Sequence, residues 1–135
     1  MIQVTVKYTG PVFQGNYEKK IEDAMVSSVA RICNVAKETA IADYLSKRKS
    51  DNPQSIIVES FTYNIPFINA LMVHGIVYAG VTPTGNAPWA IYVDQGHTLR
   101  NHTNWEGYNF MAAGELAAQE AAVNIAREEF RNLFK

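Results

Sequence analysis

The longest uninterrupted helical pattern in the chain constrains its fold more than any other feature. From about Tyr17 to Arg48 there is neither a glycine nor a proline. Apolar and small residues recur there at the spacing of one helix face: Ile21, Met25, Ser28, Ile32, Val35, Ala36 and Thr39. The pattern predicts one helix, on the order of 45 Å long. Because a compact domain of this size needs less length, we expect part of the helix to reach toward a neighbour.

The segments around this helix predict a small sheet and a second helix. Alternation of apolar and polar residues from Ile2 to Tyr8 is typical of a strand with one buried face. Two β-rich stretches, Ile56 to Asn64 and Ala70 to Val81, follow the long helix, and the proline in their connection favours a bend or an edge strand. Both faces of the second stretch are apolar. One face can take the long helix, whereas the other needs the last helix or another subunit.

A last, alanine-rich helix is expected from about Phe110 to Leu133. A brief helix before it carries Trp89, Tyr92 and Val93 and ends at Gly96. The expected fold class is therefore α+β, with a small antiparallel sheet packed against one long N-terminal helix, a short helix and a C-terminal helix. Residues 1–135 form a single domain in this interpretation.

Composition excludes several classes of function. The chain has 135 residues with a formal net charge of -1, which disfavours broad binding of nucleic-acid phosphates. No window approaches the roughly 18 consecutive apolar residues of a membrane span, so no membrane partner is expected. Cys33, the single cysteine, sits among apolar residues and is interpreted as a buried thiol.

Residues 87–116 concentrate the side chains that could carry chemistry. His97 and His102, with Asp94 and Glu106, form the one cluster with metal-ligand chemistry, but histidines five residues apart across Gly96 do not match the spacing of a helical zinc site. Stacking of nucleic-acid bases on the aromatic residues is disfavoured because Arg100 is the sole basic residue in the segment. A small metal-dependent hydrolase and a generic protein-binding adaptor both remain alternatives at this point.

The same segment resembles the signature region of a family of small tailed-phage neck proteins, described as minor tail, tail-completion or head-tail joining proteins. The matching residues fall before and after a variable polar loop: Trp89, Ala90, Tyr92, Val93, Asp94, Gly96, His97 and Thr98, then Arg100, Trp105, Gly107, Phe110 and Met111. The order of elements is also similar to that family, from a first strand and a long helix through a β-rich middle to a terminal helix.

The resemblance implies a virion structural protein that joins or completes the tail at the head-tail interface. Its partners would be sister copies in a ring, six on the family's precedent, and other neck and tail proteins. Phage DNA would pass through that ring without sequence-specific contacts. The expected location is the head-tail junction of the virion, with the host cytoplasm as the place of assembly. No catalysis, cofactor or metal is implied.

We assign anchoring or interface roles to nine residues of the segment: Trp89, Tyr92, Val93, Gly96, His97, Arg100, Trp105, Phe110 and Met111. The first three would hold the short helix on the sheet, and Gly96 would supply a positive-φ turn. Positions 97–106 would form an exposed polar loop. Trp105 and Phe110 would pin the last helix to the core, which would keep the loop at a fixed place for a neighbouring ring.

Overall fold

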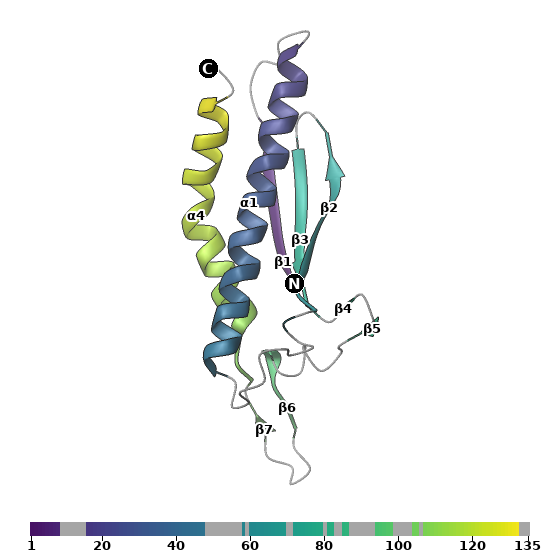
Figure 1. The fold of residues 1–135 in the computed structure, drawn as a ribbon, viewed down its shortest axis with the longest axis vertical. Helices are drawn as coiled ribbons and strands as arrows, with labels where there is room; N and C mark the ends of the chain where they lie inside the picture. The colour runs from purple at the N-terminus through teal and green to yellow at the C-terminus, as the bar shows by residue number, and fades with distance from the viewer. Residues whose placement is uncertain are drawn as a thin grey trace.

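The computed structural model describes residues 1–8, 16–47, 58, 60–69, 72–79, 81–82, 85–86, 94–98, 104–105 and 107–132. Two long helices and a three-stranded sheet make up most of this fold (Figure 1). In chain order the elements are β1 (Ile2–Lys7), α1 (Asn16–Lys47), β2 (Thr62–Ile68), β3 (Met72–Tyr78), β4 (Val81–Thr82), β5 (Gly85–Asn86), β6 (His97–Thr98), β7 (Asn104–Trp105) and α4 (Phe110–Asn132). The α+β class predicted from the sequence is confirmed. Among the described residues, no helix is both long and apolar enough to span a membrane.

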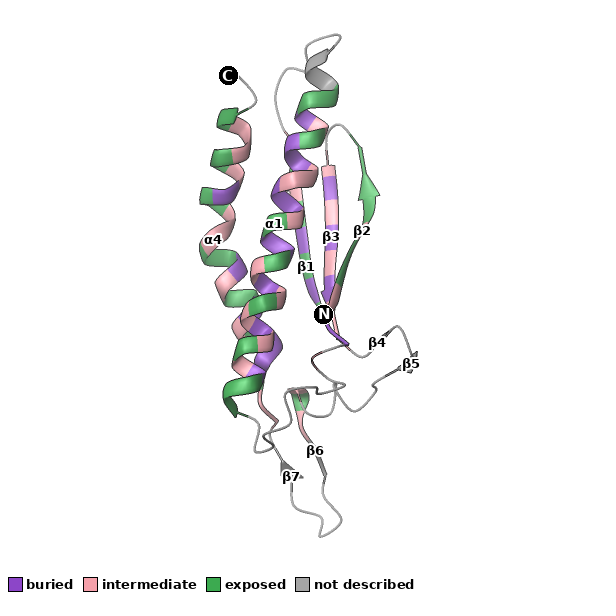
Figure 2. Ribbon diagram, viewed as in Figure 1, coloured by how far each residue is buried: buried purple, intermediate pink, exposed green. Residues whose placement is uncertain are grey.

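The sheet is antiparallel throughout, with strand order β1-β3-β2. Central strand β3 alternates between buried and half-buried residues (Figure 2). Its buried positions, Val73, Gly75 and Val77, pair with Val6, Val4 and Ile2 of β1. Paired residues of neighbouring strands share a face, so these six positions form the side of the sheet that α1 covers.

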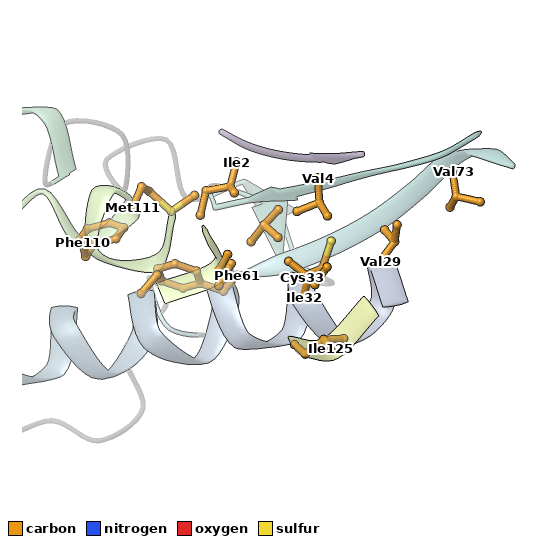
Figure 3. Packing of buried hydrophobic residues seen from close by; sticks show 14 of the residues in the cluster. Ile2, Val4, Val29, Ile32, Cys33, Phe61, Val73, Phe110, Met111 and Ile125 are labelled. Atoms are coloured by element: carbon orange, nitrogen blue, oxygen red, sulfur yellow. The ribbon is translucent and has the colours of Figure 1, made fainter. Parts of the chain in front are cut away.

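Helix α1 packs on this face at very short range because Gly75 has no side chain. A Cβ atom at Gly75 would lie 2.5 Å from Cγ1 of Val29 and 2.9 Å from Sγ of Cys33. Figure 3 shows Val4 of the sheet facing Val29 and Cys33 of the helix. Cys33 is fully buried, as the sequence predicts, and its burial raises the pKa of the thiol to about 11.

The second helix, α4, packs against α1 and not against the opposite face of the sheet. At the crossing, a Cβ atom at Gly114 would lie 2.5 Å from the carbonyl oxygen of Ala36 and 3.1 Å from Cβ of Ala40. Nearer the C-terminal end of α4, Arg31 donates to Glu128 at 2.8 Å and to Glu129 at 2.9 Å. Of the two covers expected for the second face of the sheet, the last helix is therefore excluded. The apolar residues of a strand do not indicate which element covers each face of the sheet. Gly114 of α4 allows close contact with Ala36 and Ala40 of α1, and this contact explains why α4 packs on α1.

The β-rich middle differs from the predicted boundaries. The residues expected to connect two strands, from Ile65 to Ile68, belong to β2 itself. Pro66 lies at an irregularity in the register of β2 with β3, between Asn64 and Phe67. A proline cannot donate to the ladder, but an edge strand with a bulge tolerates it. Of the two predicted alternatives, a bend or an edge strand, the structure has the edge strand, and the proline lies within it instead of in a connection.

Gly114→Ala is expected to destabilise the fold by about 1 kcal/mol. A methyl group at this position meets the backbone of α1, which forces the helices apart, and overpacking of this kind costs about 1–3 kcal/mol. The steric cost exceeds the gain of about 1 kcal/mol in helix propensity. Urea unfolding measures the difference. The exposed Asn124→Ala on the same helix is the control and should be neutral or slightly stabilising; equal stability of both variants would contradict the close crossing.

The buried thiol predicts a loss of stability in alkali. The folded pKa of Cys33, about 11, lies above the ordinary value of 9.0, so between these pH values the unfolded chain releases a proton that the fold retains. Stability therefore falls as the pH rises from about 9 to 11, by roughly 1.4 kcal/mol per pH unit. Cys33→Ala removes this component, so its unfolding free energy should decline less steeply over the same range. Parallel curves for the two proteins would show that the thiol does not contribute.

Candidate functional site

The residues that precede and follow the short hairpin β6–β7 form the candidate site. We call Asp94–Gly96 together with Gly107–Asn109 the elbow base, because these two short segments join the hairpin to the start of α4. The elbow base lies within the segment that resembles the phage neck proteins. Its backbone segments are hydrogen-bonded to each other: the Asn109 N–H donates to the Asp94 carbonyl at 2.9 Å.

Asp94 caps the last helix from a distance in sequence. Its carboxylate Oδ1 accepts a hydrogen bond from the Met111 N–H at 3.0 Å, although the two residues are 17 positions apart. The first turn of α4 contains no acidic residue of its own. Asp94 therefore satisfies one of the free N–H groups of the helix and places a negative charge at the positive end of its dipole.

Two glycines give the elbow base its tight geometry. Gly96 has φ of 87° and Gly107 has φ of 80°, both in the left-handed region that favours glycine. The positive φ predicted for Gly96 is thus confirmed. At Gly107, a Cβ atom would lie 2.5 Å from the Gly96 nitrogen and 2.6 Å from the Asp94 carbonyl oxygen. The backbones are in direct contact, with no room for any side chain at Gly107.

The segment expected to be a loop contains a small hairpin. His97 pairs with Trp105 and Thr98 pairs with Asn104 in an antiparallel ladder. This corrects the prediction that the whole of 97–106 is an exposed polar loop. Strands of two residues are too short for an alternating pattern to reveal them. Figure 1 shows β6 and β7 extending away from the end of the molecule where α1 ends and α4 begins. Because an isolated two-stranded hairpin is at best marginally stable, its position depends on the elbow base.

Phe110 and Met111 anchor the start of α4, as the sequence predicts. Phe110 is fully buried, and its ring meets the rings of Tyr44 and Phe61 edge-on at centroid distances of 5.5 and 5.4 Å. Met111 is also buried. Figure 3 shows Phe61, Phe110 and Met111 gathered at one end of the core. The elbow base is therefore fixed to the core through the first turn of α4.

Lys47 supplies a second attachment that sequence reasoning missed. Its Nζ donates to the Tyr108 carbonyl at 2.7 Å and lies 2.8 Å from Oδ2 of Asp43. The ion pair of Asp43 with Lys47 has the i,i+4 spacing that is visible in a sequence. The bond to Tyr108 joins residues 61 positions apart, and nothing in the sequence indicates it. The end of α1 is thereby tied to the elbow base.

Of the four residues in the candidate metal or acid-base set, Asp94 is the one whose side chain lies in the described part of the chain. Asp94 uses one carboxylate oxygen as a helix cap, and His97 is described only through its backbone in β6. His102 and Glu106 lie outside the described residues. Across the ranges that are described, no three His, Cys, Asp or Glu side chains form a metal-binding group.

Several predicted anchors cannot be compared with the structure. Trp89, Tyr92, Val93 and Arg100 lie outside the described residues, and Trp105 is placed only through its backbone in β7. The end of the predicted short helix is visible, because positions 94 and 95 are helical and Gly96 follows them. Of the nine predicted anchors, His97 is likewise described by its backbone alone, and Gly96, Phe110 and Met111 are described in full.

A cavity of about 220 Å³ lies beside the elbow base. Apolar groups and the already engaged Asp94 carboxylate dominate its described lining, which comprises Met1, Tyr78, Ala79, Asp94, Gln95, Phe110 and Met111. Asp94 already accepts the Met111 N–H with its Oδ1, which favours a scaffolding role for this side chain.

Replacing Asp94 tests that scaffolding role. Asp94→Ala is expected to lower the free energy of unfolding by about 1 kcal/mol, because the Met111 N–H loses its acceptor and the helix dipole loses a nearby charge. Asp94→Asn keeps an acceptor oxygen and should lose less. Thermal and urea unfolding give the values, with the exposed neighbour Gln95→Ala as control. A fold as stable in Asp94→Ala as in Gln95→Ala would remove the capping function.

Comparison of the chain with models of protein families, with curated proteins and with solved structures finds no match. The resemblance to tailed-phage neck proteins therefore rests on the residues quoted above and on the order of elements. What the chain does is inferred from those residues and from the geometry of the elbow base.

Proposed function

We propose that this chain is a structural subunit of the neck of a tailed phage. It joins or completes the tail at the head-tail interface by forming a ring of identical copies. The resemblance in residues 87–116 supplies the type of protein. The fold supports the proposal through the order of its described elements: a strand, a long helix, a β-rich middle, the elbow base and a terminal helix.

The proposal depends on one observation, the structural role of the segment that resembles the phage proteins. Its described residues serve the architecture: Asp94 caps α4, Gly96 and Gly107 bring two backbones into contact, and Phe110 fills the core. Together they hold the β6–β7 hairpin at the end of the helix pair (Figure 1). A hairpin on a rigid base at one end of a subunit is suited to contact with the next ring in a stack.

Exposed apolar side chains support assembly as well. Large hydrophobic residues remain exposed on α1, β2 and α4: Leu45, Tyr63, Phe67, Ile68, Leu116 and Val123. Scattered single residues of this kind are common, but β2 and α4 each carry at least two. Sister copies that cover these positions would complete the burial that one chain leaves unfinished.

Localisation in the particle tests the proposal. Phage particles are purified and labelled with an antibody to this chain, and electron microscopy locates the label. The expected result is label between the portal and the tail tube. In preparations made without this chain, separate heads and tails should accumulate. Particles that lack the chain altogether would contradict a virion role.

Two further outcomes identify the alternative classes. Stoichiometric metal in the purified protein, lost together with a hydrolytic activity in His97→Ala, would favour the hydrolase. A monomer that binds another protein through the hairpin, and is absent from particles, would favour the adaptor.

A further inference from the structure

A groove of about 360 Å³ runs along the free edge of β1. Strand β1 pairs with β3 on one side only, because the strand order is β1-β3-β2. Residues from both faces of β1 line the groove, and α4 forms its other wall. The described lining is Ile2, Gln3, Val4, Thr5, Val6 and Ile32, with Glu115, Ala118, Gln119, Ala122, Val123 and Ala126 of α4. At this edge a helix stands beside the sheet, and no strand from the described ranges lies in the groove between them.

At the opposite edge of the sheet, strand β2 carries exposed apolar side chains. Tyr63 and Ile68 of β2 pair with Val77 and Val73, so they lie on the face that α1 covers. They nevertheless remain 37% and 47% exposed, respectively, because α1 alone does not cover the outer strand. Figure 1 shows α4 on one side of α1 and β2 on the other, and Figure 2 shows how exposed β2 is. At this edge, none of the described helices covers the strand.

We propose that the groove between β1 and α4 binds the β2 edge of a second copy, so that copies join head to tail. The uncovered strand of one copy then takes the open place beside β1 of the next. In that position α4 covers Tyr63 and Ile68. Because the two surfaces are different patches of the same chain, an open row of copies has one of each free at its two ends, and the proposed ring forms when these two ends meet. The inference rests on the proposed ring and names the surfaces that build it.

Charge supports a second copy as the occupant. Among the described residues that line the groove, Glu115 is the single charged one. Lys37 stands beside the β2 edge, with its Nζ 5.9 Å from the centre of the Tyr63 ring. The two residues lie at the same level along α1, because the adjacent Gly114 packs on Ala36 and Ala40. A second copy placed side by side therefore brings Lys37 of one chain to Glu115 of the next.

The two edges also differ in their backbone. Strand β1 has six residues without proline, whereas β2 contains Pro66 and a break in its register. Pairing between copies therefore uses a short run of backbone hydrogen bonds, and burial of Tyr63 and Ile68 supplies the remainder of the affinity. The same irregularity limits open-ended strand pairing with unrelated chains.

A pair of blocking variants tests the interface. Val123→Arg places a long cation at the rim of the groove, at a position that is 58% exposed in the single chain. Ile68→Arg does the same at the β2 edge. Each variant alone should weaken self-association at least about tenfold in sedimentation, with an unchanged circular dichroism spectrum. Asn124→Arg, next to Val123 on α4 but outside the groove lining, should assemble like the wild type.

Mixing the two blocked proteins gives the decisive measurement. The Val123→Arg chain keeps an intact β2 edge, and the Ile68→Arg chain keeps an intact groove. An equimolar mixture should therefore form a one-to-one heterodimer and nothing larger. Continued monomers in the mixture, or unaltered assembly of Val123→Arg, would overturn the head-to-tail interface.

The outcomes separate this inference from the proposed function. Label at the neck with normal assembly of Val123→Arg would refute the interface and leave the neck role intact. A heterodimer formed by a chain that is absent from particles would refute the neck role and leave the interface intact.

Discussion

The close contact of α1 with backbone on two sides is the constraint on which the rest of the structure depends. On one side Gly75 lets β3 approach Val29 and Cys33, and on the other Gly114 lets α4 approach Ala36. Close-packed interiors resist even one added methyl group, so both glycines fix the distances between layers. The sheet, α1 and α4 are thereby stacked in a defined order, with α4 beside α1 instead of across the sheet.

This order determines where the elbow base lies. Because α4 crosses α1 at Gly114, its first turn reaches the end of α1, where Phe110 meets Tyr44 and Lys47 meets the carbonyl of Tyr108. Asp94 then closes the arrangement by capping the same turn. The hairpin β6–β7 is held by three contacts, which involve α1, α4 and the segment that contains Asp94. Within this segment, the described Asp94 side chain thus positions another element, the start of α4.

The same stacking leaves the two edges of the sheet unequal. One helix stands beside the edge of β1 and forms a groove with it, while β2 remains exposed at the other edge. In the proposed ring, these two surfaces of neighbouring copies complement each other. This property connects the packing of the core with the proposed ring, because moving α4 would remove the groove and change both.

Periodicity by itself determined much of this protein. The spacing of apolar residues places α1 and α4 to within a residue at each end, the alternation from Ile2 gives β1, and Gly96 before a polar segment marks a positive-φ turn. These features depend on neighbours within a few positions, which is why sequence patterns predict them. Only the tertiary structure decided which surface α4 covers, that Pro66 lies inside an edge strand, and that Asp94 and Lys47 hold the elbow base. Those contacts join residues far apart in sequence, and no local pattern encodes the distance of closest approach that Gly75 and Gly114 allow.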